Sequence, residues 1–172
     1  MVDRSSGGVR DDRDRDGAGR PRNARPRDAA GRPLPRGAAG VERIPDDLVL
    51  SAEETAIEAQ RLLDAGRPFH AHEVLEAAWK AAQPTDRELW RALAQVAVGL
   101  THLQRGNARG AVALLTRGAE GLTRWRGGHA GPPPARLDVD GVVRHAEELA
   151  ARVEYAGVDA TTPADLHPRL RP

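Results

Sequence analysis

Residues 62–79, LLDAGRPFHAHEVLEAAW, and residues 102–119, HLQRGNARGAVALLTRGA, align with each other at an offset of 40. The alignment pairs Leu63 with Leu103, Gly66 with Gly106, Ala71 with Ala111, and Leu75 with Leu115. In each copy an alanine follows the glycine by five residues, so two antiparallel helices can meet at a tight turn, as in tetratricopeptide-like hairpins. Two such hairpins packed side by side predict a four-helix core.

Turn and capping residues set the expected helix limits. Ser51 and Glu54 form a capping box, Pro68 suits a first helical turn, and Thr85 with Glu88 suggests a second capping box. Asn107 and Asp138 are typical N-cap residues. The first two helices are therefore expected over residues 52–65 and 68–82. The third begins at the Thr85–Glu88 box and ends at residue 105, and the last two cover residues 108–126 and 138–156. No window alternates with period two, and the predicted fold is all-α: a compact bundle of about five helices.

The flanking segments differ from this core in composition. Residues 1–40 hold ten arginines and six aspartates among many Gly and Pro, so they bury too little apolar surface to order themselves. We expect a disordered tail at 1–40, a four-helix domain at 41–126, a Gly/Pro linker at 127–137, a helix at 138–156 and a loose tail at 157–172.

Charge and composition restrict the class of protein. Residues 41–172 carry 16 basic and 19 acidic side chains and few aromatics, which argues against nucleic-acid binding. The sequence has no cysteine and no apolar run of membrane-spanning length, so we expect a cytoplasmic protein without a membrane anchor. Abundant Arg, Ala and Gly with a single lysine, Lys80, are typical of a GC-rich bacterial genome.

Polar side chains interrupt the apolar face of the second helix. His72, Glu76 and Trp79 share one side of it, beside the stripe that contains Leu75, whereas His70 and Glu73 are expected further outward. The third helix is apolar nearly all round and carries Gln95 and His102 two turns apart, with Gly99 between them. Packing these two faces together predicts one polar cluster of His72, Glu76, Trp79, Gln95 and His102, with Glu73, further outward, as an additional candidate member.

The stretches HAHEVLEAAWK and ALAQVAVGLTHLQRGNARGAVALL resemble a bacterial family known as domain of unknown function 309. The shared motifs are an "AHE-x-LE-x-x-W" helix, a glutamine-containing helix that runs to a histidine, and a "GN-x-x-GA" turn. The resemblance covers about residues 51–125 and implies a small all-helical fold without implying an activity. By motif position it marks the same cluster residues and Asn107, which the spacing explains as a structural cap.

Three functional interpretations follow from the cluster. In the first, it is structural or holds a small ligand against Trp79. In the second, His72, Glu76 and His102 bind a divalent metal (zinc, iron or manganese) for hydrolase-type chemistry. The spacing lacks the second histidine of an H-E-x-x-H helix.

In the third interpretation, the hairpins form a protein-interaction module, as stacked helical hairpins do, with a protein partner or a second copy of the chain as the ligand. The remaining aromatic and histidine residues are expected to have other roles. Trp90 and Trp125 are predicted in the core or an interface, His70 at the surface, and His129, His145 and His167 without companions.

Overall fold

The computed structural model describes residues 26–41 and 49–172. Its helices are α1 (Ala52–Asp64), α2 (Pro68–Ala81), α3 (Arg87–Gln104), α4 (Ala108–Gly128) and α5 (Val139–Ala156), with three 3-10 turns, η1 (Pro134–Arg136), η2 (Val158–Ala160) and η3 (Pro163–Leu166). This part of the chain contains no β-strand, only an isolated bridge between Arg27 and Pro33. The all-α class and the five helices are confirmed.

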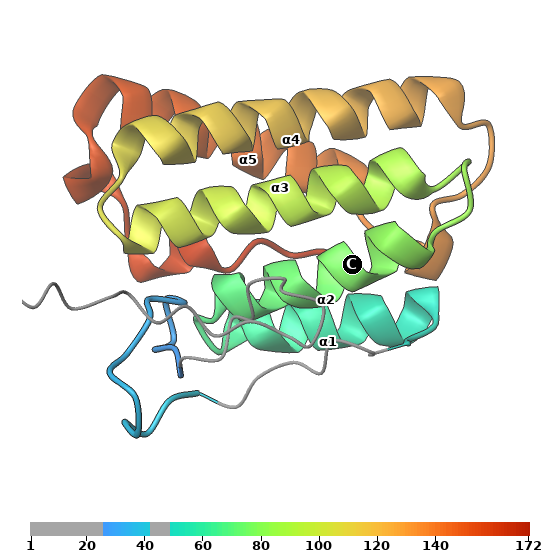
Figure 1. The fold of residues 1–172 in the computed structure, drawn as a ribbon. Coiled ribbons are helices and arrows are strands. Elements are labelled where there is room, and N and C mark those ends of the chain that lie inside the picture. The colour runs from blue at the N-terminus through green and yellow to red at the C-terminus, as the bar shows by residue number, and fades with distance from the viewer. Residues whose placement is uncertain (1–25, 42–48) are drawn as a thin grey trace, which may run out of the picture.

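Each helix packs on the next one in the chain (Figure 1). The central helix α3 lies between α2 and α4, and the other face of α4 receives α5. The core consists mainly of leucine, alanine and valine, and Leu62, Leu75, Leu93 and Leu115 are almost fully buried. The helix expected at 138–156 is present as α5 and lies along α4.

Most of the expected helix ends are confirmed. Ser51 and Glu54 form the predicted capping box, and the side chains of Asn107 and Asp138 accept hydrogen bonds from Gly110 N and Gly141 N. The second predicted box, Thr85 with Glu88, is wrong. Asp86 is the N-cap of α3 without a side-chain bond.

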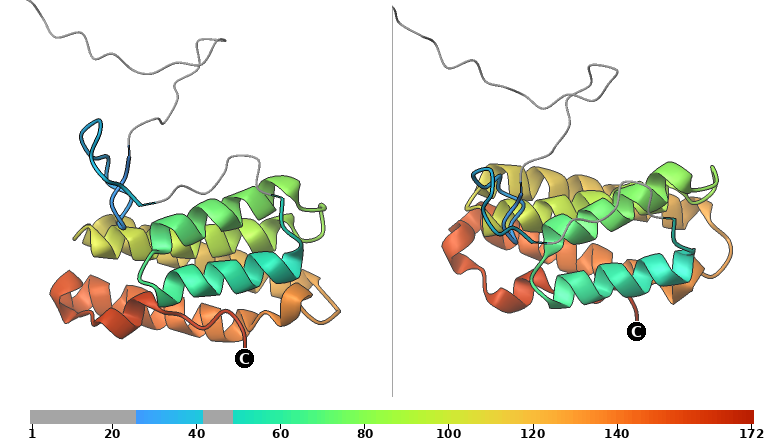
Figure 2. Two further views of the ribbon diagram at one scale, coloured as in Figure 1. Left: turned by 90° about the horizontal axis from the view of Figure 1, so that it is seen from below. Right: turned by 60° about the horizontal axis from the view of Figure 1, so that its bottom comes forward.

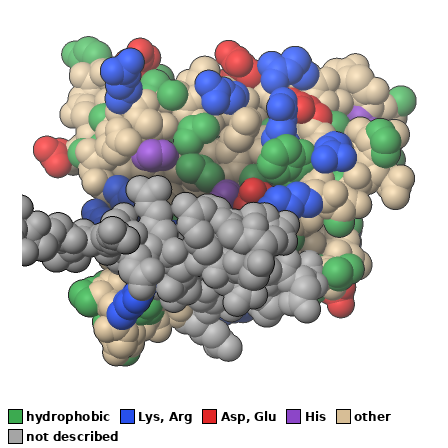
Figure 3. All heavy atoms as spheres, viewed as in Figure 1, with side chains coloured by type: hydrophobic (Ala, Val, Ile, Leu, Met, Phe, Trp, Pro, Cys, Tyr) green, Lys and Arg blue, Asp and Glu red, His purple; other side chains and the backbone are tan. Residues whose placement is uncertain are grey.

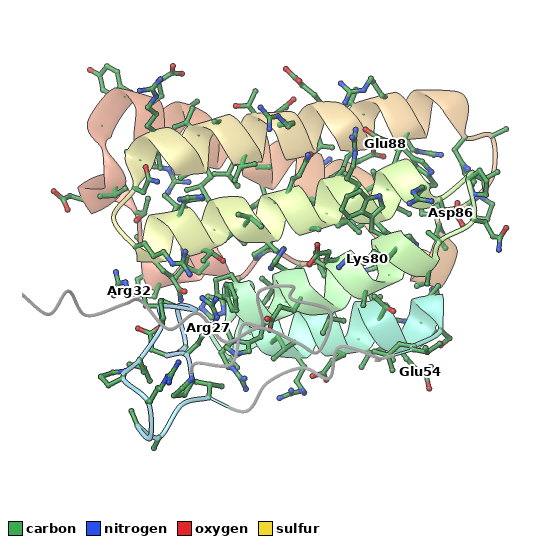
Figure 4. The ribbon with its side chains drawn as sticks, viewed as in Figure 1. Arg27, Arg32, Glu54, Lys80, Asp86 and Glu88 are labelled. Atoms are coloured by element: carbon green, nitrogen blue, oxygen red, sulfur yellow. The ribbon has the colours of Figure 1, made fainter. Side chains whose placement is uncertain are left out.

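Other partners explain the loss of the second box. Glu88 pairs with Arg91 at 2.7 Å and Arg124 at 3.2 Å, and Figure 4 shows it on the α4 side of α3. The Thr85 carbonyl accepts a 2.8 Å bond from Trp125 Nε1.

Close contact between α3 and α4 depends on Gly99. A Cβ atom at this position would lie 2.8 Å from Leu115 Cγ and 3.1 Å from Leu115 N. The absence of a side chain at Gly99 therefore permits the close approach of α4.

Residues 157–172 do not form the loose tail expected from their prolines. Leu170 is 2% exposed, its N–H donates to Gln60 Oε1 at 2.7 Å, and its carbonyl accepts from Asp138 N at 2.8 Å. These bonds fix the segment between α1 and the beginning of α5, and Figure 2 shows it running beside α1.

The segment expected to be disordered lies partly outside the described residues, since only residues 26–40 of it can be assessed. These residues form a loop in which Leu34 N donates to Pro26 O at 2.7 Å and Val41 N donates to Arg27 O at 2.8 Å. The loop contacts α2 and α3, as the next section describes.

Candidate functional site

Three charged or ionisable side chains form a ladder along α2. Glu76 lies 3.7 Å from His72 Nε2 on one side and 3.3 Å from Lys80 Nζ on the other, each pair one helical turn apart. The predicted proximity of His72 and Glu76 is therefore present, and Figure 3 shows histidine, acidic and basic side chains side by side over α2. Lys80, which is 66% exposed, completes the ladder.

The His72 imidazole is held in its neutral form. Burial lowers its pKa most, Glu76 and the Phe69 backbone raise the pKa, and Lys80 and Arg105 lower it further. The net result is a pKa below the usual value of 6.5, and His72 Nδ1 is buried without a partner in ordinary hydrogen-bond geometry. A neutral His72 imidazole can form a hydrogen bond with a neighbouring side chain, but it does not form a strong ion pair with Glu76, because that pair requires a protonated ring.

An aromatic ring at the beginning of α2 connects this ladder to the loop at residues 26–41. The Phe69 ring lies 5.8 Å from the His72 ring, and the guanidinium groups of Arg27 and Arg105 lie 5.3 and 5.6 Å from its centroid. Both distances are within the range of cation–π attraction. Arg27 appears beside the first turn of α2 in Figure 4.

The loop also makes backbone contacts at this place. Arg105 Nε donates to Ala30 O at 2.9 Å, and Gly31 packs so closely on Phe69 that an added Cβ would lie 2.2 Å from the ring. The sequence interpretation did not include Phe69, Arg105 or Arg27. The only available signal was the sole phenylalanine of the chain, placed directly after the helix-initiating Pro68.

His102 belongs to the turn between α3 and α4. Its Nδ1 lies 2.8 Å from Asn107 Nδ2, while Asn107 Oδ1 accepts from Gly110 N at 2.9 Å. The amide nitrogen can only donate, so His102 Nδ1 accepts and the ring is neutral. Burial, followed by the charge of Arg105, lowers the His102 pKa in agreement with this assignment.

The other predicted members of the cluster are half-buried side chains on the same two helices. Glu73 and Trp79 lie on α2 and Gln95 on α3, and Trp79 packs against the edge of the hydrophobic core. The structure thus joins His72 to Glu76 and His102 to Asn107, as two separate local pairs.

The metal interpretation needs His72, Glu76 and His102 in one ligand set. Within residues 26–41 and 49–172, no group of three or more His, Asp or Glu side chains is placed so that it could hold a metal ion. The predicted metal ligands therefore remain a prediction from spacing, without geometric support.

The expected surface position of His70 is wrong. Its side chain is 2% exposed, its ring meets Phe69 edge-on at 5.5 Å, and its Nδ1 lacks a hydrogen-bond partner. Burial, followed by the charge of Arg67, lowers the pKa of His70 to about 4, although Asp28 raises it. The helical wheel could not predict this burial because the loop carrying Asp28 is distant in sequence.

The remaining tryptophan and histidine residues lie outside the predicted cluster. Trp90 and Trp125 are buried as predicted, and His129 stacks on Trp125 with centroids 4.3 Å apart. His145, expected to have no companion, has its Nε2 2.9 Å from the Asp165 carbonyl oxygen. His167 lines a groove described below.

Comparison with known proteins identifies the central segment. Residues 56–114, from α1 to the first part of α4, match the model of the family described as "Domain of unknown function (DUF309)". This match confirms the family resemblance over the matched segment. No curated protein and no solved structure matches the chain. No helix among the described residues is long and apolar enough to cross a membrane.

Proposed function

We propose that this protein is a helical interaction module that binds a turn-forming, arginine-containing segment at the Phe69 end of α2 and α3. The observation that carries the proposal is the seating of residues 26–41 on this surface, with Arg27 over the Phe69 ring at 5.3 Å. In this structure the chain's own loop occupies the surface. A partner segment with an arginine at the same place would make the same contacts.

The chemistry of the surface favours a segment of this kind. Phe69 offers an aromatic face to a guanidinium group, and Arg105 donates to the backbone carbonyl of Ala30 in the turn of the loop, a contact that a partner segment with the same turn can make. At Gly31 the loop backbone approaches the Phe69 ring so closely that the side chain of any larger residue would overlap the ring. These contacts select an arginine and a small residue four positions later.

The polar ladder lies next to this surface. The His72 ring contacts Phe69 at 5.8 Å, and Glu76 supplies a carboxylate one turn further along α2. We therefore assign His72 and Glu76 to the border of the binding surface, where they orient the Phe69 ring and attract basic side chains. The small-ligand and metal-dependent alternatives have no comparable contact in their favour.

A peptide binding assay tests the proposal. A fluorescent peptide of residues 26–41 is titrated against residues 49–172, whose helical content is first checked by circular dichroism. Saturable binding is expected, with at least fivefold weaker binding for Phe69→Ala and for a peptide with Arg27→Ala. Tyr155→Ala, which removes an aromatic side chain that is 95% exposed on α5, is the matched control. Equal binding by Phe69→Ala and the control would disprove the proposal.

A further inference from the structure

A groove of about 710 Å³ lies between α1 and the C-terminal segment, away from the Phe69 surface. Its side chains come from three parts of the chain: Ile57, Gln60, Arg61 and Asp64 from α1, Arg136 from η1, and residues 167, 169, 171 and 172 from the C-terminal segment. Figure 2 shows α1 and that segment side by side. The volume is within the range of small-molecule sites.

The wall of the groove is fixed by hydrogen bonds. The Gln60 side chain donates to Pro168 O at 3.2 Å and to Asp64 Oδ1 at 2.8 Å, and accepts from Leu170 N at 2.7 Å. Leu170 is itself buried in the core. The backbone that carries the neighbouring arginines of the C-terminal segment is therefore held in place before a ligand binds. This lowers the entropic cost of binding.

Four arginines line this groove, and they differ in their partners. Arg61 pairs with Glu58 at 2.6 Å, and Arg171 pairs with Glu53. Within the described part of the chain, no ion pair joins Arg136 or Arg169 to a carboxylate, and Asp64, the acidic side chain in the lining, is bonded to Gln60. Two guanidinium groups in one groove thus retain their capacity to bind an anion.

The backbone at Arg136 is unusual. Ala135 and Arg136 both have positive φ angles, 55° and 54°, a conformation that residues with a side chain rarely adopt. Such backbone strain is often found at functional sites, where the surrounding structure holds a side chain in a required position. Here it accompanies an arginine without an ionic partner that faces a groove.

We infer that this groove binds a small organic molecule with a phosphate group. Arg136 and Arg169 bind the phosphate oxygens, because guanidinium groups match them with paired hydrogen bonds. Arg61 and Arg171 add positive charge at the border. Ile57, which is 49% exposed, supplies an apolar surface for the organic part of the ligand. This inference is independent of the interaction surface at Phe69.

Isothermal titration of the full chain with inorganic pyrophosphate, at constant ionic strength, tests the inference. The wild type is expected to bind saturably at one site. The double variant Arg136→Gln/Arg169→Gln is expected to bind at least tenfold more weakly. Its melting temperature without ligand should stay close to that of the wild type, because neither side chain has an ionic partner. The control is Arg109→Gln/Arg117→Gln, which removes two exposed arginines from α4.

The control pair should bind pyrophosphate within twofold of the wild type. An equal loss in both double variants would show attraction by overall charge and overturn the inference. So would the absence of saturable binding to the wild type. Citrate, titrated in parallel, distinguishes phosphate from carboxylate, and binding of citrate as tight as that of pyrophosphate would overturn the assignment of the ligand class.

Discussion

Arg27 and Phe69 meet across the surface of the bundle, with the guanidinium carbon 5.3 Å from the ring centroid. The contact joins a loop outside the segment that matches the DUF309 family model to the first turn of α2 inside that segment. Arg105, the C-cap residue of α3, lies 5.6 Å from the same ring. The domain therefore holds its own loop through Phe69 and Arg105, and several consequences can be measured.

Gly31→Ala should release the loop. Its Cβ would overlap the Phe69 ring at 2.2 Å, and the residue has a φ of 72°. Gly37→Ala is a matched control, because Gly37 also has a positive φ, 84°, but has no atom within 4 Å of the added Cβ. Limited trypsin digestion should cleave after Arg27 several times faster in Gly31→Ala than in Gly37→Ala. Equal cleavage rates would show that the Phe69 contact does not hold the loop.

Acidification should destabilise the protein through His70. Its pKa is about 4 in the folded chain and about 6.5 when unfolded, so below pH 6.5 only the unfolded state binds the proton. Stability is therefore present above pH 6.5 and is lost as the pH falls toward 4. The loss amounts to about 2–3 kcal/mol by pH 4.5.

Urea unfolding at pH 7.5 and 4.5 measures this effect. His70→Gln should lose less unfolding free energy between the two pH values than the wild type, by about 2 kcal/mol. The comparison removes the contribution of the carboxylates, which both proteins share. If the two proteins lose the same free energy, His70 titrates normally in the folded state and the burial argument is wrong.

The α3–α4 contact should not tolerate a larger residue at Gly99. Gly99→Ala places a Cβ 2.8 Å from Leu115 Cγ, and the overpacking should cost about 1–3 kcal/mol despite the better helix propensity of alanine. Gly127→Ala, also in a helix but with open space around it, should be neutral or stabilise by up to about 1 kcal/mol. Chemical denaturation compares the two variants. A stable Gly99→Ala would contradict the tight approach of the helices.

The contact between His102 and Asn107, where α3 leads into α4, can be tested with two measurements. Asn107→Ala removes the N-cap of α4 and should cost about 1 kcal/mol. Asn107→Asp keeps an oxygen for Gly110 N and places a carboxylate beside His102 Nδ1, so the His102 pKa should rise. NMR titration of the imidazole measures that rise. An unchanged His102 pKa in Asn107→Asp would show that the two side chains are not in contact.

Local sequence patterns predicted the helices well. Capping residues and glycines mark the ends of α1, α4 and α5 because they act on backbone groups within one turn. The nearly all-apolar sequence of the third helix likewise agrees with the burial of α3 between its neighbours. The predicted Thr85–Glu88 capping box does not form, because Glu88 makes ion pairs with arginines on α3 and α4 instead.

The candidate site was harder to predict because it depends on contacts between distant segments. His72 and Glu76 are neighbours by helix geometry alone, and the structure contains that pair. The burial of His70, the arginine contacts of Phe69 and the packing of residues 157–172 need the path of the chain outside the helices. No periodicity encodes that path, so composition alone suggested disorder and a loose tail.

Hydrogen exchange across residues 26–41 of the full chain tests the central claim most directly. In the wild type, the amides of Leu34 and Val41 should be protected, because both donate hydrogen bonds within the seated loop. Phe69→Ala should raise their exchange rates at least tenfold, while Tyr155→Ala leaves them unchanged and both variants keep the protection of α3. Protection that persists in Phe69→Ala, or exchange already fast in the wild type, would contradict the binding surface proposed at the start of α2.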